Sequence, residues 1–158
     1  MIVSTTIFES AADMDKVLDY SDTNDEITKR IESVDALCQT SGSVVGHILH
    51  RANPPEEFSP KICVRDMIVA GDGNLASLID TVAELGQEDW GVRKAVSISV
   101  PLGAMNSNQV RATAFFESMA DFEIARGNMI QSSLIPKIID LRAAPHTRIV
   151  SRILSFTR

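Results

Sequence analysis

The sequence predicts a helix-rich α+β or α/β fold with a small sheet of three or four strands and a helical arm at the C-terminus. Residues 61–126 carry strand and helix patterns in alternation, and helical periodicity dominates both flanks. The chain has 158 residues, of which 44% are hydrophobic, and this composition suits one globular unit. We therefore expect a single domain over residues 1–145 and a basic amphipathic arm over residues 146–158.

The N-terminal part of the chain predicts one short strand and two helices. Residues 2–8 are β-branched and apolar, as is typical of a strand. Ser10 is a typical helix N-cap, and with Asp13 three positions later it predicts a helix that runs to about Tyr20. A second helix follows, because its apolar residues recur at spacings of four, three and three: Ile27, Ile31, Val34 and Leu37. Residues 44–51 fit either an extension of this helix or a strand.

A strand–helix–strand unit is predicted for the centre of the chain. Residues 53–60 contain three prolines and are expected to form a loop, because proline lacks a backbone donor and disfavours helix before it. Residues 61–70 and 92–100 read as strands, the second from its alternating apolar residues. Residues 74–85 between them present the apolar stripe of a helix, which Gly86 is expected to end. A helix of this length suits a crossover between parallel strands.

The C-terminal part is predicted to be helical. A helix capped at Asn106 is expected to run to about Arg126. Its core stripe, expected to be buried against the 92–100 strand, consists of Phe115, Met119 and Phe122. Gly127–Asn128 is expected to break this helix, and residues 130–141 form the next one. After Pro145, a final amphipathic helix is predicted from three apolar residues at spacings of four and three: Ile149, Ile153 and Phe156.

Charge is distributed unevenly along the chain, whose net charge is -6. Residues 1–36 contain nine acids and three bases, whereas residues 141–158 contain four arginines and no acid. A basic, apolar arm is expected to dock on the acidic head, within the chain or between chains, or on a phosphate-bearing partner such as nucleic acid. The predicted interaction residues are Arg142, Arg148, Ile149, Arg152, Ile153, Phe156 and Arg158.

No motif for catalysis, cofactor binding or metal binding emerges from the sequence. Cys38, His47, His50 and Cys63 follow no standard zinc spacing, so no metal is predicted, and whether these four residues converge stays open. Gly71-Asp72-Gly73 lacks the remaining residues of a phosphate-binding loop and reads as a turn. A serine nucleophile motif is absent, and one carboxylate of perturbed pKa stays open as a catalytic group.

Two short segments resemble known families. The segment from Phe116 to Asn128 is similar to the closing helix of GAF-type sensory domains, which implies a domain that binds a small molecule. The segment from Ser97 to Ser107, with the helix expected after it, resembles the last strand and first helix of single-stranded RNA phage coat proteins, which implies a capsid subunit.

The function predicted from these observations is a non-enzymatic, self-associating structural or assembly protein, such as a viral or phage coat subunit. We expect a homo-oligomer located in the cytoplasm, or in the virion if the protein is viral. No apolar run is long enough to span a membrane, so no membrane partner is expected. The alternatives are a GAF-like regulatory domain that binds a small molecule and an enzyme of unrecognised type.

Overall fold

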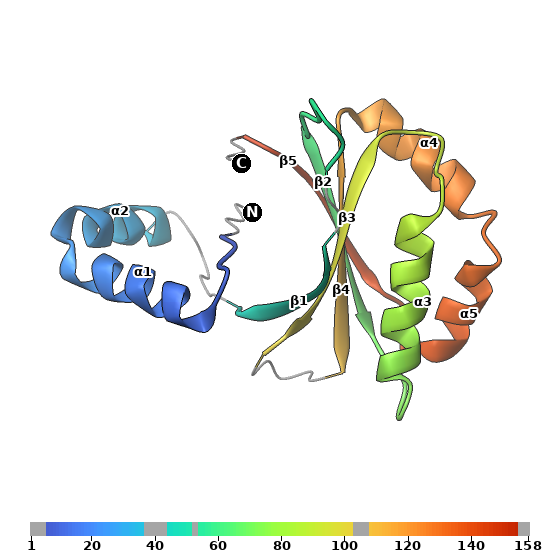
Figure 1. Ribbon diagram of the computed structural model, residues 1–158, viewed down its shortest axis with the longest axis horizontal. Coiled ribbons are helices and arrows are strands. Elements are labelled where there is room, and N and C mark those ends of the chain that lie inside the picture. The colour runs from blue at the N-terminus through green and yellow to red at the C-terminus, as the bar shows by residue number, and fades with distance from the viewer. Residues whose placement is uncertain (1–5, 37–43, 52–53, 103–107, 155–158) are drawn as a thin grey trace. The chain divides into compact units, whose positions relative to one another are not determined.

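The computed structural model describes residues 6–36, 44–51, 54–102 and 108–154, and the chain divides into two compact units, Met1–Ser43 and Val44–Arg158. The first unit holds two helices and the second holds the remaining elements (Figure 1). In chain order, the elements are α1 (Ala11–Thr23), α2 (Asp25–Asp35), β1 (Gly46–Arg51), β2 (Ile62–Val69), α3 (Leu75–Gln87), β3 (Lys94–Pro101), β4 (Gln109–Phe116), α4 (Met119–Met129), α5 (Leu134–Leu141) and β5 (Thr147–Arg152).

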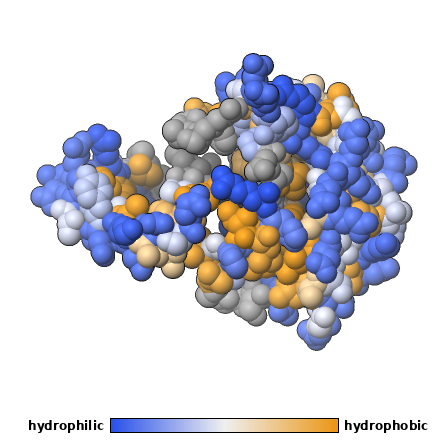
Figure 2. Space-filling model, in the orientation of Figure 1, coloured by the Kyte–Doolittle hydropathy of each residue, from blue (hydrophilic) through white to orange (hydrophobic). Residues whose placement is uncertain are grey.

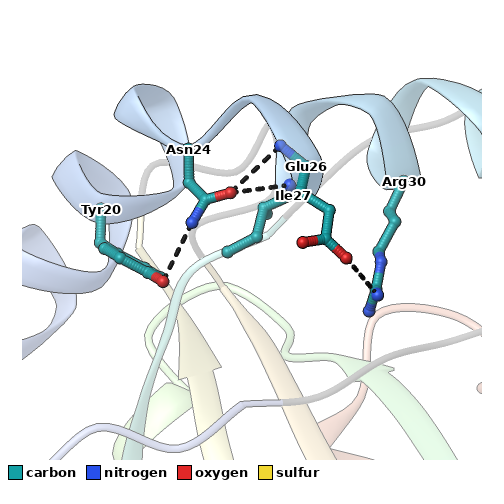
Figure 3. A network of polar contacts seen from close by, with 5 residues as sticks. All are labelled: Tyr20, Asn24, Glu26, Ile27 and Arg30. Atoms are coloured by element: carbon teal, nitrogen blue, oxygen red, sulfur yellow. Dashed lines mark hydrogen bonds and ion pairs between the residues drawn. The ribbon is translucent and has the colours of Figure 1, made fainter.

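The first unit is a pair of helices whose N-termini are capped by side chains. Ser10 Oγ accepts a hydrogen bond from the backbone nitrogen of Asp13 at 3.2 Å, which confirms the predicted start of α1. Asn24 caps α2, because its side-chain oxygen accepts from the backbone nitrogens of Glu26 at 3.1 Å and Ile27 at 3.3 Å (Figure 3). Neither helix has a buried residue among those described, so local capping is a main source of order here.

The second unit is a five-stranded sheet with helices α3, α4 and α5 on one face (Figure 1). Every pair of neighbouring strands is antiparallel, and the spatial order is β1-β3-β4-β2-β5. Strands β2 and β3 both run antiparallel to β4, so the predicted crossover joins parallel strands that have β4 between them. The elements from β2 to β5 thus have the ferredoxin-like arrangement, with β1 added beyond β3. The predicted α+β class is confirmed, but the sheet has five strands rather than three or four.

The core lies between the sheet and its three helices. Val64 and Ile68 of β2 and Val110 and Phe116 of β4 are all buried on this side, because alternate residues of a strand face the same side. The ring of Phe116 stacks against Trp90, with 6.4 Å between the centroids. An aromatic contact at this distance adds to the stabilisation that the two rings gain from burial.

Strand β4 replaces the first half of the helix that was predicted from Asn106 to Arg126. The helical spacing of Phe115, Met119 and Phe122 suggested one continuous stripe, but this prediction is wrong. Phe116 is the buried ring of β4, at 2% exposure, whereas Phe115 points to the opposite face and Met119 is 46% exposed. Only Phe122, on α4, joins the core as expected.

The prediction of a helical C-terminal arm is also wrong where the structure describes this segment, because residues 147–152 form strand β5. Three of its six residues are β-branched (Thr147, Ile149 and Val150), and β5 pairs along the full register with the edge of β2. A short amphipathic helix is marginal without a packed face, so an available strand edge prevails. Ile153 continues this pairing, since its backbone nitrogen donates to the Lys61 carbonyl at 2.8 Å.

Several predicted boundaries also change. Residues 6–8 of the first predicted strand are not in a strand, and residues 2–5 lie outside the described part of the chain. The open choice over residues 44–51 is resolved as strand β1. Gly86 lies inside α3 rather than ending it, because a Cβ there would stand 3.0 Å from the Val96 side chain, so glycine allows the helix to approach the sheet. Gly127 and Asn128 likewise lie within α4.

Strand β1 forms one edge of the sheet and pairs only with β3. Hydrophobic side chains gather on the surface around this strand (Figure 2). Val44, Val45 and Leu49 are exposed there, by 55%, 46% and 38%. The register shifts between Ile48 and His50, and such a bulge interrupts the regular edge that β1 presents to other strands.

Candidate functional site

An apolar hollow lies between the helix-side face of the sheet and helices α3, α4 and α5. Two adjoining spaces of about 270 and 560 Å³, counting the part open to solvent, share six wall residues: Val64, Asp66, Trp90, Ala114, Met129 and Arg148. About 80 Å³ of the larger space is accessible to the centre of a water molecule. That is room for several water molecules, or for a small organic group in their place.

The hollow exists because the inward side of β4 has small residues at its middle. Its four inward positions are Val110, Ala112, Ala114 and Phe116, so two alanines stand between two larger side chains. The helices rest on the larger residues, and the space over the alanines stays unfilled. Neighbouring strands contribute Val64 and Val96, which complete an apolar floor.

Trp90 forms a fixed wall of this hollow. Its indole nitrogen donates to the Leu85 carbonyl at 3.1 Å, and the Asn128 amide donates to the Trp90 carbonyl at 2.9 Å. The Lys94 ammonium lies 4.5 Å from the centroid of the ring and donates to the Gly86 carbonyl at 2.9 Å. Burial lowers the pKa of this lysine, while the negative charges near it oppose that shift. These contacts hold the ring in one orientation, so the wall is preorganised.

A charged pair lines both parts of the hollow on the side of β5, the edge strand of the sheet, and we call this side the mouth of the hollow. Asp66 of β2 lies directly opposite Arg148 of β5 in the sheet register. The Arg148 Nε donates to Asp66 Oδ1 at 2.7 Å, and its Nη2 donates to Asp66 Oδ2 at 2.8 Å. The side chains are only 18% and 27% exposed, so this bidentate pair is stronger than a surface ion pair. The pair uses one edge of the guanidinium, and the Nη1 end is therefore not engaged by Asp66.

His146 joins this pair and has a defined tautomer. Its Nδ1 lies 3.3 Å from Arg142 Nη1, and its Nε2 lies 3.6 Å from Asp66 Oδ1. A guanidinium can only donate, so in this contact Nδ1 accepts and the proton of the neutral ring stands on Nε2. The imidazole thus presents an N–H group near the carboxylate, beside the wall of the larger space.

The arrangement suits a ligand that has an apolar body and an oxygen with negative charge at one end. The body would contact the alanines and Trp90, whereas the oxygen would accept hydrogen bonds from Arg148 or His146. In a site with little water, such donors also stabilise an oxygen on which negative charge develops during a reaction. The hollow can therefore bind a small molecule and assist chemistry at its polar end.

The residues predicted for interaction fall at different places in the fold. Arg142 follows α5 and contacts His146, and Arg148 lies in the ion pair at the mouth of the hollow. Ile149 points to the opposite face of the sheet, because it follows Arg148 in the same strand. Arg152 ends β5 and is exposed, and Ile153 follows it. Phe156 and Arg158 lie outside the described part of the chain, and contact with nucleic acid stays a prediction.

The structure separates the residues weighed as metal ligands. His47 and His50 are exposed on β1, whereas Cys63 is buried on β2, with β3 and β4 between those strands. Cys38 lies outside the described residues. Within the described ranges, no group of three His, Cys, Asp or Glu residues is placed to hold a metal ion. Burial raises the pKa of the Cys63 thiol, with Arg65 acting in the opposite direction.

Sequence reasoning missed Asp66 and His146 as site residues, and it selected Arg148 for a different role. One signal was available for Asp66. It occupies the same alternating positions as Ile62, Val64 and Ile68, and a carboxylate on the buried face of a strand needs a partner. No signal identified that partner, because Arg148 is 82 positions away in the sequence.

No family model matches this chain, and no curated protein matches it either. Two solved structures share its fold. A protein of unknown function from Nitrosomonas europaea is 16% identical, with a TM-score of 0.51 over 63% of this chain and 94% of that protein. A proposed monooxygenase from Fusobacterium nucleatum is 12% identical, with a TM-score of 0.57 over 89% of this chain. This chain spans 64% of that second protein.

The predicted role as a non-enzymatic assembly or coat subunit is wrong. The fold is shared with a proposed monooxygenase, and the segment that resembled a phage coat protein leads into β4 rather than into a helix. The resemblance to GAF domains fails for a related reason, because the strand before α4 is β4 and not the 92–100 strand. The described residues include no helix long and apolar enough to cross a membrane.

Proposed function

We propose that the protein is an enzyme that binds a small aromatic or otherwise apolar organic molecule in the hollow and oxidises it with dioxygen. One oxygen atom enters the product, and the other leaves as water with the two hydrogens that the substrate loses. The observation that carries this proposal is the position of Asp66, Arg148 and His146 at the mouth of a space with apolar walls. An apolar pocket on which a small number of polar groups converge is typical of a small-molecule site.

The ligand class follows from the donors at the mouth. Arg148 Nη1 and His146 Nε2 both donate, so they suit an oxygen that is negatively charged or becomes so. A phenol or an enol has such an oxygen attached to a flat apolar body. Asp66 accepts hydrogen bonds from Nε and Nη2 of Arg148. The carboxylate therefore orients the guanidinium but does not engage its Nη1.

The reaction class is supported by the fold and by the chemistry of the proposed ligand. The structural neighbour that covers 89% of this chain is described as a proposed monooxygenase. A phenolate or enolate is electron-rich, so stabilisation of its oxygen anion by Arg148 and His146 also favours the form that is most easily oxidised.

Binding is tested by the fluorescence of Trp90, which is the single tryptophan of the chain and lines the hollow. We titrate the full chain with 4-nitrophenol, which absorbs where tryptophan emits, and with nitrobenzene, which has the same ring without the hydroxyl. We expect saturable quenching by 4-nitrophenol and affinity for nitrobenzene that is lower by at least about tenfold, because nitrobenzene offers the donors only its weakly accepting nitro oxygens and no ionisable hydroxyl.

Two variants with matched controls make this test specific. Arg148→Met is expected to weaken 4-nitrophenol binding by at least about tenfold, whereas Arg152→Met, an exposed arginine on the same strand, leaves it unchanged. Ala114→Leu fills the hollow and is expected to abolish binding, whereas Ala120→Leu on the exposed side of α4 does not. Equal effects within either pair would refute the assignment of the site.

Oxidation is tested apart from binding. Oxygen uptake is measured with a panel of phenols that bind in the fluorescence assay, and the products are identified by mass spectrometry. We expect oxygen uptake by the wild type that Ala114→Leu abolishes. Binding without oxygen uptake for every ligand of the panel would refute the oxidation and leave the binding site in place.

A further inference from the structure

The face of the sheet opposite the helices carries a positive centre that the proposed reaction does not use. Arg65 of β2 and Arg111 of β4 both point to this face. They lie diagonally across neighbouring strands, because Arg65 is opposite Thr113 and Arg111 is opposite Met67. Side chains in such a diagonal are about 7–8 Å apart at their base, well within reach of one another's guanidinium groups.

Arg111 is held in this place at an energetic cost. Its Nε is buried and has no hydrogen-bond partner among the described residues. Burial and the positive charge of Arg65 both lower the pKa of the Arg111 guanidinium, burial being the larger cause. In the described strands β2 to β5, no Asp or Glu points to this face, so no carboxylate of these strands neutralises Arg111.

Hydroxyl groups lie next to Arg111 on the same face, and one of them, that of Thr113, is also opposite Arg65. Ser99 is opposite Arg111 and Ser97 is opposite Thr113, so β3 and β4 place three hydroxyls beside the guanidinium groups. Paired residues share a face in an antiparallel sheet, and these hydroxyls therefore point the same way as the arginines. Arginine forks and hydroxyl donors together are the groups that proteins use to bind oxyanions.

We propose that this face of the sheet binds the phosphate group of a small molecule, with Arg111 and Arg65 as the charged ligands and Ser97, Ser99 and Thr113 as hydroxyl donors. A phosphate monoester carries a charge of about −1.5 to −2 at neutral pH. This charge balances the two positive charges of the arginines more closely than the single negative charge of a carboxylate ligand would. It also has three terminal oxygens, enough to accept from both arginines and from the hydroxyls. The site is separate from the hollow, because alternate residues of the same strands form the two faces.

The proposal is tested by isothermal titration of the full chain with inorganic phosphate and, in parallel, with acetate. We expect saturable binding of phosphate and affinity for acetate that is weaker by at least about tenfold. Arg111→Met is expected to weaken phosphate binding by at least about tenfold, and Arg111→Lys by several-fold, because lysine keeps the charge and loses the fork. Arg152→Met is the matched control, since it removes an exposed arginine from the helix-side face of the same sheet.

Thermal unfolding supplies a second readout that does not depend on affinity. Arg111→Met is expected to raise the melting temperature of the ligand-free protein, because it removes a partly buried charge whose Nε has no hydrogen-bond partner among the described residues. It is also expected to remove the rise that phosphate causes in the wild type. Binding of phosphate that persists in Arg111→Met, that is lost equally in Arg152→Met, or that is no tighter than binding of acetate would overturn the proposal. If Arg111→Met does not fold, Arg111→Lys and Ser99→Ala decide the same question.

Discussion

Arg148→Met is expected to reduce the free energy of unfolding by about 2 kcal/mol, because it leaves the Asp66 carboxylate half-buried without its partner. Exposed ion pairs contribute roughly 0–1 kcal/mol, and removal of one partner from a fully buried pair costs about 3–5 kcal/mol. Asp66 and Arg148 are 18% and 27% exposed and share two hydrogen bonds of 2.7 and 2.8 Å, so the expected cost lies between these limits.

A double-mutant cycle separates this pair from other effects of the substitution. Arg148→Met, Asp66→Asn and the double variant are unfolded in urea, and unfolding is followed by the fluorescence of Trp90. We expect a coupling energy of about 1–2 kcal/mol between the two positions, and a change below about 0.5 kcal/mol for Arg152→Met. A coupling energy below about 0.5 kcal/mol would refute the argument that the pair is shielded from water and rigidly held.

Three further predictions concern the core and the titrating groups. Phe116→Ala is expected to cost about 3–5 kcal/mol in urea unfolding, and Met119→Ala less than about 0.5 kcal/mol; a reversed order would contradict the assignment of the buried face. In a Cys38→Ser background, Cys63 is expected to react with a disulfide reagent at least about tenfold more slowly than in the unfolded chain, because burial raises its pKa and lowers its thiolate fraction; equal rates would contradict this. Burial lowers the pKa of Lys94 in the folded state below the 10.5 that is usual for lysine, so the unfolded chain binds more protons. The contribution of Lys94 to stability therefore rises as the pH rises toward 10.5. The stability of the wild type relative to Lys94→Met should therefore increase from about pH 8 to about pH 10, and a decrease would contradict the sign.

The sequence predicted the elements in which large apolar residues alternate clearly with small or polar ones. Strands β2 and β3 and helix α3 were placed correctly, because Val, Ile and Leu mark their buried positions. Strand β4 was missed because Ala112 and Ala114 occupy two of its buried positions, and alanine is compatible with a helix as well as with a strand. The same two alanines create the hollow, so the feature that concealed the strand also produces the candidate site.

Strand β5 and the polar mouth of the hollow could not be predicted, because both depend on pairing between distant segments. Residues 147–152 are short, and their β-branched side chains take strand geometry only where the edge of β2 is available. Arg148 meets Asp66 only in the register that this pairing sets. A shift of one residue would send Arg148 to the other face of the sheet.

The most direct measurement is a crystal structure of the protein with 4-nitrophenol bound. We expect the ring to lie in the hollow against Ala112, Ala114 and Trp90, with the phenolic oxygen about 3 Å from a nitrogen of Arg148 or His146. A ring bound outside this hollow, or one bound with its oxygen directed away from Arg148 and His146, would contradict the proposed site and the chemistry assigned to it.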